Sequence, residues 1–211
     1  MKKKLLIIPV VHNEEELGSL KENISRLKEE KLGAEEHKRQ VEQVHEFWEN
    51  VSALISEIMQ ITDPEKIQVY QDGLPAGGEL GKKIVYECAG NKIKNYRIIA
   101  GMLDRGAEIE QTESPRYIKE EYEIIKKIFS AESAEEQKRM SLQYTERLHE
   151  LGILRDKYIA DRINSSLKDG FTGVIFIGAT HNIIPNLSKK IDYYVNDFNR
   201  EALLHWIKKQ T

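Results

Sequence analysis

The clearest strand in the chain reads Gly173-Val174-Ile175-Phe176-Ile177-Gly178. It is a continuous apolar run with no polar alternation, which is typical of a strand covered by helices on both faces. Leu5–Val11 has the same character near the N-terminus, and two further runs, Ile67–Gln71 and Ile191–Val195, resemble it. A short segment at Ala107–Gln111 completes a predicted set of five strands.

Helical periodicity fills the chain between these runs. The longest predicted helix extends from Ala34 to Ile61, because one apolar stripe recurs through it at helical spacing. Its first part is very polar, so we expect it to project from the body. Ser114 followed by Pro115 predicts another helix, which continues to about Phe129. The remaining predicted helices are Asn13–Leu27, Leu80–Ala89, Asn95–Asp104, Ala131–Gln143, Tyr144–Lys168 and Glu201–Lys209.

Strands that alternate with helices predict an α/β fold with a mainly parallel sheet. Right-handed crossovers would place helices on both faces of about five strands, with a long helical insertion after the first strand. The 211 residues are enough for one sizeable core and short for two full domains, so we expect a single domain over 1–211 with a helical region at 131–168.

Composition narrows the class of partner. Lys and Arg number 32 against 35 Asp and Glu, and a net charge of −3 gives no electrostatic case for nucleic acid or an anionic membrane. No run approaches the ~18 apolar residues of a membrane helix, and Leu5–Val11, interrupted by Pro9, is interpreted as a strand and not as a signal peptide. The one cysteine, Cys88, suits a reducing compartment, so we expect a cytoplasmic protein.

Polar residues follow the predicted strands where each of them ends. His12, Asp72, Glu113 and His181-Asn182 take these places, and ligands of open parallel sheets bind at the carboxyl ends of the strands. Imidazoles and carboxylates hold divalent metal ions and also serve as general acids and bases. We therefore predict His12, His181 and Glu113 as metal ligands or catalytic residues, and Asp72 and Asn182 as substrate contacts.

Arg155 is also a predicted catalytic residue. It lies four residues after Leu151 and four before Ile159, on the inward stripe of its helix. A buried guanidinium needs a carboxylate partner, for which Glu113, Asp72 and Asp156 are candidates. It can stabilise an oxyanion or bind a substrate carboxylate, and the alternative is a purely structural ion pair.

Each position also has a structural explanation that involves no ligand. A histidine before a helix, such as His12, often caps it or faces solvent, and Glu113 would favour the positive end of the helix that follows. Asp72 precedes Gly73, a pair that is common in turns.

Taken in order, these residues resemble a known superfamily. Gly178-Ala179-Thr180-His181 follows a strand, Arg155-Asp156 lies on the preceding helix, and His12 and Glu113 follow earlier strands. The set is similar to that of the erythromycin esterases, ChaN-like proteins and the TraB/PrgY–TIKI group, whose two Gly-x-x-His motifs follow strands. This chain departs from the first motif, because Pro9 stands where the family has Gly.

The resemblance implies a shared fold and site more strongly than a shared reaction. Some members are thought to be metal-dependent proteases, some hydrolyse an ester ring, and some bind a tetrapyrrole. The leading hypothesis is a hydrolase of ester or amide bonds that acts on a small molecule or peptide, either with a divalent metal ion or by direct activation of water. The alternatives are a non-catalytic protein that binds an anionic molecule or tetrapyrrole, and a scaffold or homo-oligomer formed through the charged helix at Ala34–Val51.

Overall fold

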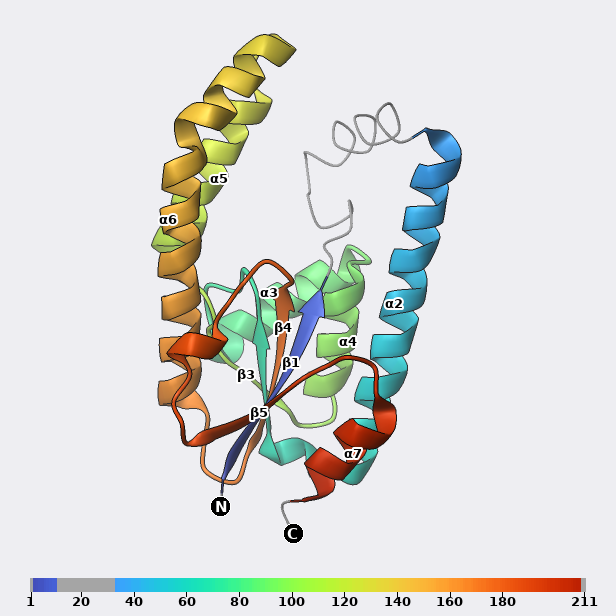
Figure 1. Ribbon diagram of the computed structural model, residues 1–211. Coiled ribbons are helices and arrows are strands. Elements are labelled where there is room, and N and C mark those ends of the chain that lie inside the picture. Colours follow the sequence, from blue (N-terminus) through green and yellow to red (C-terminus); the bar gives the residue numbers. More distant parts are fainter. Residues whose placement is uncertain (1, 11–32, 210–211) are drawn as a thin grey trace.

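The computed structural model describes residues 2–10 and 33–209. Its centre is a parallel five-stranded sheet in the order β3-β2-β4-β1-β5 (Figure 1). The strands are β1 (Lys3–Val10), β2 (Ile67–Gln71), β3 (Glu108–Ile109), β4 (Thr172–Gly178) and β5 (Ile191–Val195). The α/β class and the parallel sheet predicted from the sequence are confirmed. His12 and the predicted helix at Asn13–Leu27 lie outside the described residues.

The centre of the sheet is β4, in which every residue is buried. Its side chains alternate between two cores: Val174 and Phe176 face one, and Ile175 and Ile177 face the other. Because both faces are covered, the strand has no polar alternation, as its sequence indicates. β4 pairs with β1 and β2 in a register that sets Val10 opposite Gly178 and Gln71 opposite Phe176. The residues that follow these strands therefore emerge at one edge of the sheet.

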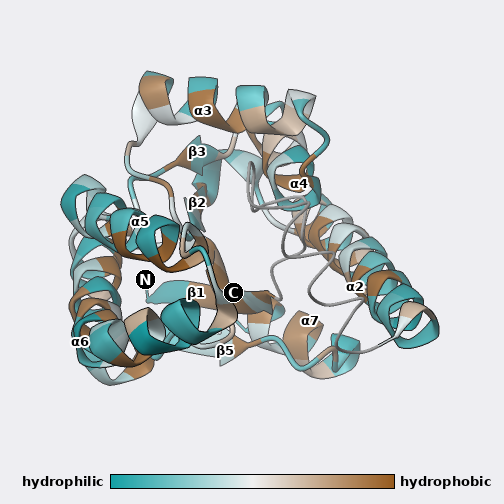
Figure 2. Cartoon of the chain, turned by 90° about the horizontal axis from the view of Figure 1, so that it is seen from above, coloured by the Kyte–Doolittle hydropathy of each residue, from teal (hydrophilic) through white to brown (hydrophobic). Residues whose placement is uncertain are grey.

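Helices cover both faces of the sheet (Figure 2). One face packs against α2 (Ala34–Ile61), α4 (Lys94–Leu103) and α7 (Arg200–Lys208), with α3 (Gly78–Gly90) beside β3. The other face packs against α6 (Ala134–Ser166), and α5 (Pro115–Phe129) packs on α6. None of the described helices is both long enough and apolar enough to cross a membrane.

Two long helices, α2 and α6, extend beyond the carboxyl edge of the sheet (Figure 1). The bounds of α2 are those predicted, and its buried residues begin only at Trp48, while the earlier Val41 has 52% of its surface exposed. The segments 131–143 and 144–168, predicted as two helices, form the single helix α6. It continues because Met140, Tyr144 and Leu148 keep one stripe against α5.

The strand predicted at Ala107–Gln111 is only two residues long. β3 pairs with β2 through Gln68 with Glu108 and Val69 with Ile109, at the edge of the sheet. Beyond it, Thr112 Oγ1 accepts a hydrogen bond from the Gln71 backbone N–H at 3.0 Å, so a side chain continues the pairing where the strand ends.

A close backbone approach fixes α3 against the loop that follows β2. A Cβ atom on Gly81 would lie 2.6 Å from the Ala76 carbonyl oxygen. We predict that Gly81→Ala lowers the free energy of unfolding by about 1–3 kcal/mol despite the better helix propensity of alanine. The matched control is Gly101→Ala in α4, where nothing lies within 4 Å of the added carbon; it should be neutral or stabilising by up to ~1 kcal/mol. Urea denaturation of both variants tests this, and equal effects would contradict it.

Candidate functional site

Arg155 lies at the centre of a buried polar cluster on the α6 face of the sheet. Its Nε donates to Glu113 Oε1 at 2.9 Å, and its Nη2 donates to Glu113 Oε1 at 2.5 Å and to Asp72 Oδ1 at 2.8 Å. Nη1 donates to Glu121 Oε2 at 2.6 Å. The predicted inward position is confirmed, with Glu113 and Asp72 as two of its partners.

Backbone contacts fix the two most buried carboxylates. Asp72 follows β2, and its N–H donates to the Phe176 carbonyl at 2.9 Å, which extends the pairing with β4 by one step. Its Oδ2 accepts from the Gly178 N–H at 3.0 Å. The Glu113 N–H donates to the Leu74 carbonyl at 2.9 Å, in the loop after β2. The Asp72 side chain is thus held by the end of β4, and the backbone of Glu113 is held by the loop after β2.

His181 is held between two carboxylates. Its Nδ1 contacts Asp156 Oδ1 at 2.5 Å, and the other oxygen of Asp156 accepts from the Asn182 N–H at 2.9 Å. The second ring nitrogen, Nε2, lies 3.4 Å from Asp72 Oδ2. Asp156 follows Arg155 on α6, so one turn of this helix fixes both the guanidinium and the imidazole ring.

The cluster carries more negative than positive groups. Within the described residues, four carboxylates surround one guanidinium and one imidazole, and they belong to Asp72, Glu113, Glu121 and Asp156. Charges removed from water are costly unless they are compensated. The cluster therefore favours an additional positive charge, which can be a proton or a metal cation.

The pKa values of two groups in the cluster are raised. Burial raises the pKa of Glu113 to about 7, although the hydrogen bond and charge of Arg155 act in the opposite direction. Burial lowers the pKa of His181, but the contacts with Asp72 and Asp156 outweigh it and the net shift is upward. Without a bound cation, the site thus holds protons near neutral pH.

Three of the side chains fit a divalent metal ion. Asp72, Glu113 and His181 each offer one ligand atom, and these atoms all lie within 4.8 Å of one another. The 3.4 Å between His181 Nε2 and Asp72 Oδ2 matches two ligands of a tetrahedral ion, which are about 3.4 Å apart at bond lengths of ~2.1 Å. Glu113 Oε2 is buried and has no hydrogen-bond partner among the described residues.

Asp156 is not one of the three possible ligands, but it contacts one of them, His181. Metal-binding histidines commonly donate their other ring N–H to a carboxylate, which fixes the tautomer and the ring orientation. The contact between His181 Nδ1 and Asp156 has this form and leaves Nε2 facing Asp72.

An open depression of about 550 Å³ gives solvent access to the cluster. The charged groups on its wall are Glu121, Arg155 and Asp156. His149 and His181 contribute imidazoles, and Leu148 and Ile153 add apolar surface. A small molecule seated in this depression would therefore contact the guanidinium and the imidazole together.

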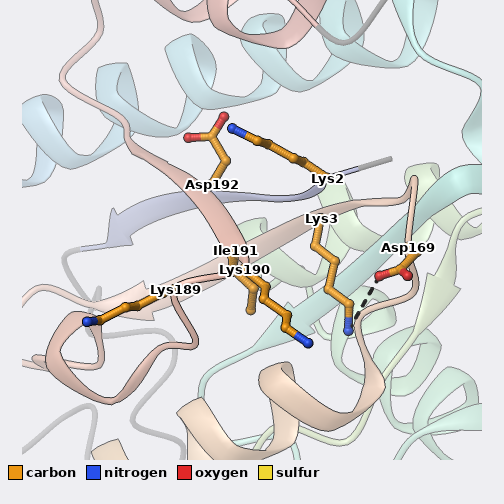
Figure 3. A pocket seen from close by; sticks show the side chains of 7 residues that line it. All are labelled: Lys2, Lys3, Asp169, Lys189, Lys190, Ile191 and Asp192. Atoms are coloured by element: carbon orange, nitrogen blue, oxygen red, sulfur yellow. Dashed lines mark ion pairs between the residues drawn. The ribbon is translucent and has the colours of Figure 1, made fainter.

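A second hollow, of about 620 Å³, lies at the opposite edge of the sheet (Figure 3). It is lined mainly by lysines: Lys2, Lys3, Lys189 and Lys190, with Asp169 and Asp192. Figure 3 shows Lys2 on one side of β1 and Lys3 and Lys190 on the other, so the ammonium groups do not converge on one point. The carboxyl edge is therefore the better candidate site.

The structure brings together most of the residues predicted from strand ends. Glu113, Arg155 and His181 meet, and Asp72, predicted as a substrate contact, is also a possible metal ligand. Asn182 contributes its backbone N–H to the cluster. His12 lies outside the described residues, so its predicted role stays a prediction.

The sequence interpretation missed the roles of two acidic residues. Asp156 had been considered only as a partner of Arg155, and its contact is with His181. Glu121 lies seven residues after Ser114, two helical turns into α5, and this spacing is the one signal that could have placed it on the same face as the start of the helix.

No protein-family model, curated protein or solved structure matches this chain. The resemblance described from the sequence motifs therefore stays a prediction, and the chemistry of the site is inferred from its own residues.

Arg155 is predicted to be essential for the fold. Arg155→Met leaves two buried carboxylates without their cation and should lower the free energy of unfolding by about 3–5 kcal/mol at pH 7. The control is Arg200→Met, which removes an equally short pair with Glu57 whose arginine is 70% exposed; its effect should be much smaller, because solvent screens it. Urea denaturation compares the two, and similar losses would contradict the central position of Arg155.

Stability of the metal-free protein should fall as pH rises from about 4.5 to about 7. Folded Glu113, with its pKa near 7, binds a proton over a range in which an unfolded glutamate near 4.5 has lost it. Stability from this proton is present at the lower pH and lost as pH rises through 7, by up to about 3 kcal/mol. His181, with its raised pKa, acts in the same direction.

The matched variant for this pH dependence is Glu113→Gln, which is uncharged throughout the range. Unfolding in urea with a chelator present, from pH 4.5 to 8, should give a smaller decline for the variant than for wild type. Parallel curves would show that Glu113 does not titrate in this way.

Proposed function

We propose that the protein is a hydrolase of ester or amide bonds that holds a divalent metal ion at Asp72, Glu113 and His181. The observation that carries the proposal is the meeting of three ligand atoms within 4.8 Å, together with a buried Glu113 oxygen that has no hydrogen-bond partner in the part of the chain that the structure describes. The negative excess of the cluster supports a cation at this place, and the adjoining depression supplies a route for a substrate.

A metal ion bound there would lower the pKa of a coordinated water toward ~7 and so supply a nucleophile at neutral pH. Arg155 orients Asp72 and Glu113, since its Nη2 donates to both carboxylates and its Nε donates to Glu113 as well. Asp156 holds His181 in the tautomer whose Nε2 is free to bind.

Hydrolysis adds a water oxygen to the carbonyl carbon and breaks the bond to the leaving oxygen or nitrogen. The water proton must pass to the leaving group, and a carboxylate of the site can carry it between the two. Asp156 and Glu121 line the depression and are the acidic groups closest to solvent in this cluster.

The substrate we propose is a small molecule or a peptide. A net charge of −3 and an acidic site give no attraction for nucleic acid or an anionic lipid surface. The single cysteine, Cys88, fits an enzyme of the reducing cytoplasm, where disulfides are rare.

Metal analysis tests the proposal. Protein purified without a histidine tag or chelator should contain close to one equivalent of a divalent metal ion, measured by plasma mass spectrometry. His181→Ala and Glu113→Gln should lose it, and Asp156→Asn should bind about 10–100-fold more weakly. Affinity should rise with pH through about 7, because protons compete for the same groups.

His149→Ala is the control, because His149 is on the same helix and lines the same depression. It should keep the metal. A folded wild-type protein that takes up neither zinc, manganese nor cobalt in calorimetric titration would contradict the metal-dependent hydrolase. It would turn attention to a binding protein for an anionic small molecule.

A further inference from the structure

The guanidinium of Arg155 has two buried edges and one that is accessible. The side chains of Glu113 and Asp72, which Nε and Nη2 contact, are 0% and 6% exposed. Glu121, which Nη1 contacts, is 26% exposed. Within residues 2–10 and 33–209, Arg155 is the only ion-pair partner of Glu121. The Nη1 edge of the guanidinium thus pairs with Glu121, the carboxylate that is most exposed to solvent.

This accessible edge belongs to the depression that leads to His181. Both Arg155 and Glu121 line it, together with Asp156. Because Nε and Nη2 are engaged by buried carboxylates, Nη1 is the part of the guanidinium that a molecule in the depression can reach. Glu121 occupies this position from α5, across from α6.

We propose that Glu121 occupies the position of a substrate carboxylate, which replaces it on Arg155 when the substrate binds. This inference rests on the proposed hydrolase function and names its substrate class. The planar guanidinium is suited to carboxylates, and Glu121 is the most exposed of its three partners, so one carboxylate can exchange for another at this place. The bonds to Glu113 and Asp72 remain and keep the guanidinium in place.

The position of this edge restricts the substrate further. Arg155 Nη2 contacts Asp72 Oδ1, and the other oxygen of Asp72 lies 3.4 Å from His181 Nε2. Under this proposal, a carboxylate on Nη1 would lie on the side of the cluster that holds the proposed metal position, near the bond that is cleaved. Amides of this kind are N-acyl amino acids and the C-terminal residue of a peptide. Leu148 and Ile153, which is 57% exposed, offer apolar contact to the side chain of such a residue.

Binding of two probes that differ in one group tests the inference without any need for turnover. N-acetylleucine carries the carboxylate, and N-acetylleucinamide has the same shape without the charge. Calorimetric or NMR titration of wild type should show the acid binding at least about tenfold more tightly, as expected for one charge-assisted hydrogen bond. Equal binding of both probes would overturn the inference.

The variant Glu121→Gln tests whether a substrate carboxylate displaces Glu121 from Arg155, or whether Glu121 has only a structural role. The variant removes the competing charge and should bind N-acetylleucine about two- to fivefold more tightly than wild type. Its control is Glu120→Gln, because Glu120 pairs with Arg147 and not with Arg155; this variant should bind as wild type does. Unchanged or weaker binding by Glu121→Gln, with the fold intact by circular dichroism, would overturn displacement.

A cationic probe, leucinamide with its free amine, covers the opposite case. Tight binding of leucinamide that is lost in Glu121→Gln would make Glu121 a site for a cation and would overturn the inference. Titrations with a chelator and with added zinc keep the two proposals distinct. Zinc uptake without preference for the acid overturns only the substrate class, and preference for the acid without zinc uptake overturns only the metal-dependent reaction.

Discussion

The ion pairs of one buried guanidinium join the parts of the candidate site. Arg155 on α6 contacts Asp72 after β2, Glu113 before α5 and Glu121 within α5. Such a cluster is weak evidence of stability, because desolvation offsets much of the attraction between the charges. Its consequence is geometric: two carboxylates that would repel each other are fixed side by side, and His181 closes the group from the end of β4. The site therefore depends on how α6 lies against the carboxyl edge of the sheet.

Periodicity and turn residues predicted the bounds of several elements well. The bounds of α2, β2 and β5 were those expected, because an apolar stripe or run bounded by turn residues specifies each of them. The placement of Glu113 and His181 at one edge followed from parallel strands that end there, and the inward position of Arg155 followed from the apolar stripe of its helix. The continuity of α6 was missed. Its charged first part hides the stripe of Met140, Tyr144 and Leu148, and the sequence contains no glycine or proline that ends a helix there. The contacts of Asp156 with His181 and of Glu121 with Arg155 depend on the rotation of two helices about their axes, which sequence patterns do not specify.

The charge of the cluster connects its structure to its proposed chemistry. Among the described residues, four carboxylates meet one guanidinium and one imidazole, and the pKa values of Glu113 and His181 are raised, so both groups favour a proton. A metal ion would replace these protons and bind the Glu113 oxygen for which residues 2–10 and 33–209 provide no hydrogen-bond partner. The same excess explains why a substrate carboxylate would bind by replacing Glu121 and not by adding to the cluster. A non-catalytic binding protein would use the same depression, and metal dependence separates the two.

The most direct test of the metal site is a crystal structure of the protein grown with zinc, with diffraction data collected on both sides of the zinc absorption edge. The account predicts one anomalous peak at the carboxyl edge of the sheet, ~2.0–2.2 Å from His181 Nε2 and from oxygens of Asp72 and Glu113. His181 should keep its contact with Asp156. An anomalous map without a peak at these three side chains, in crystals whose zinc concentration saturates other surface sites, would contradict the proposed metal centre.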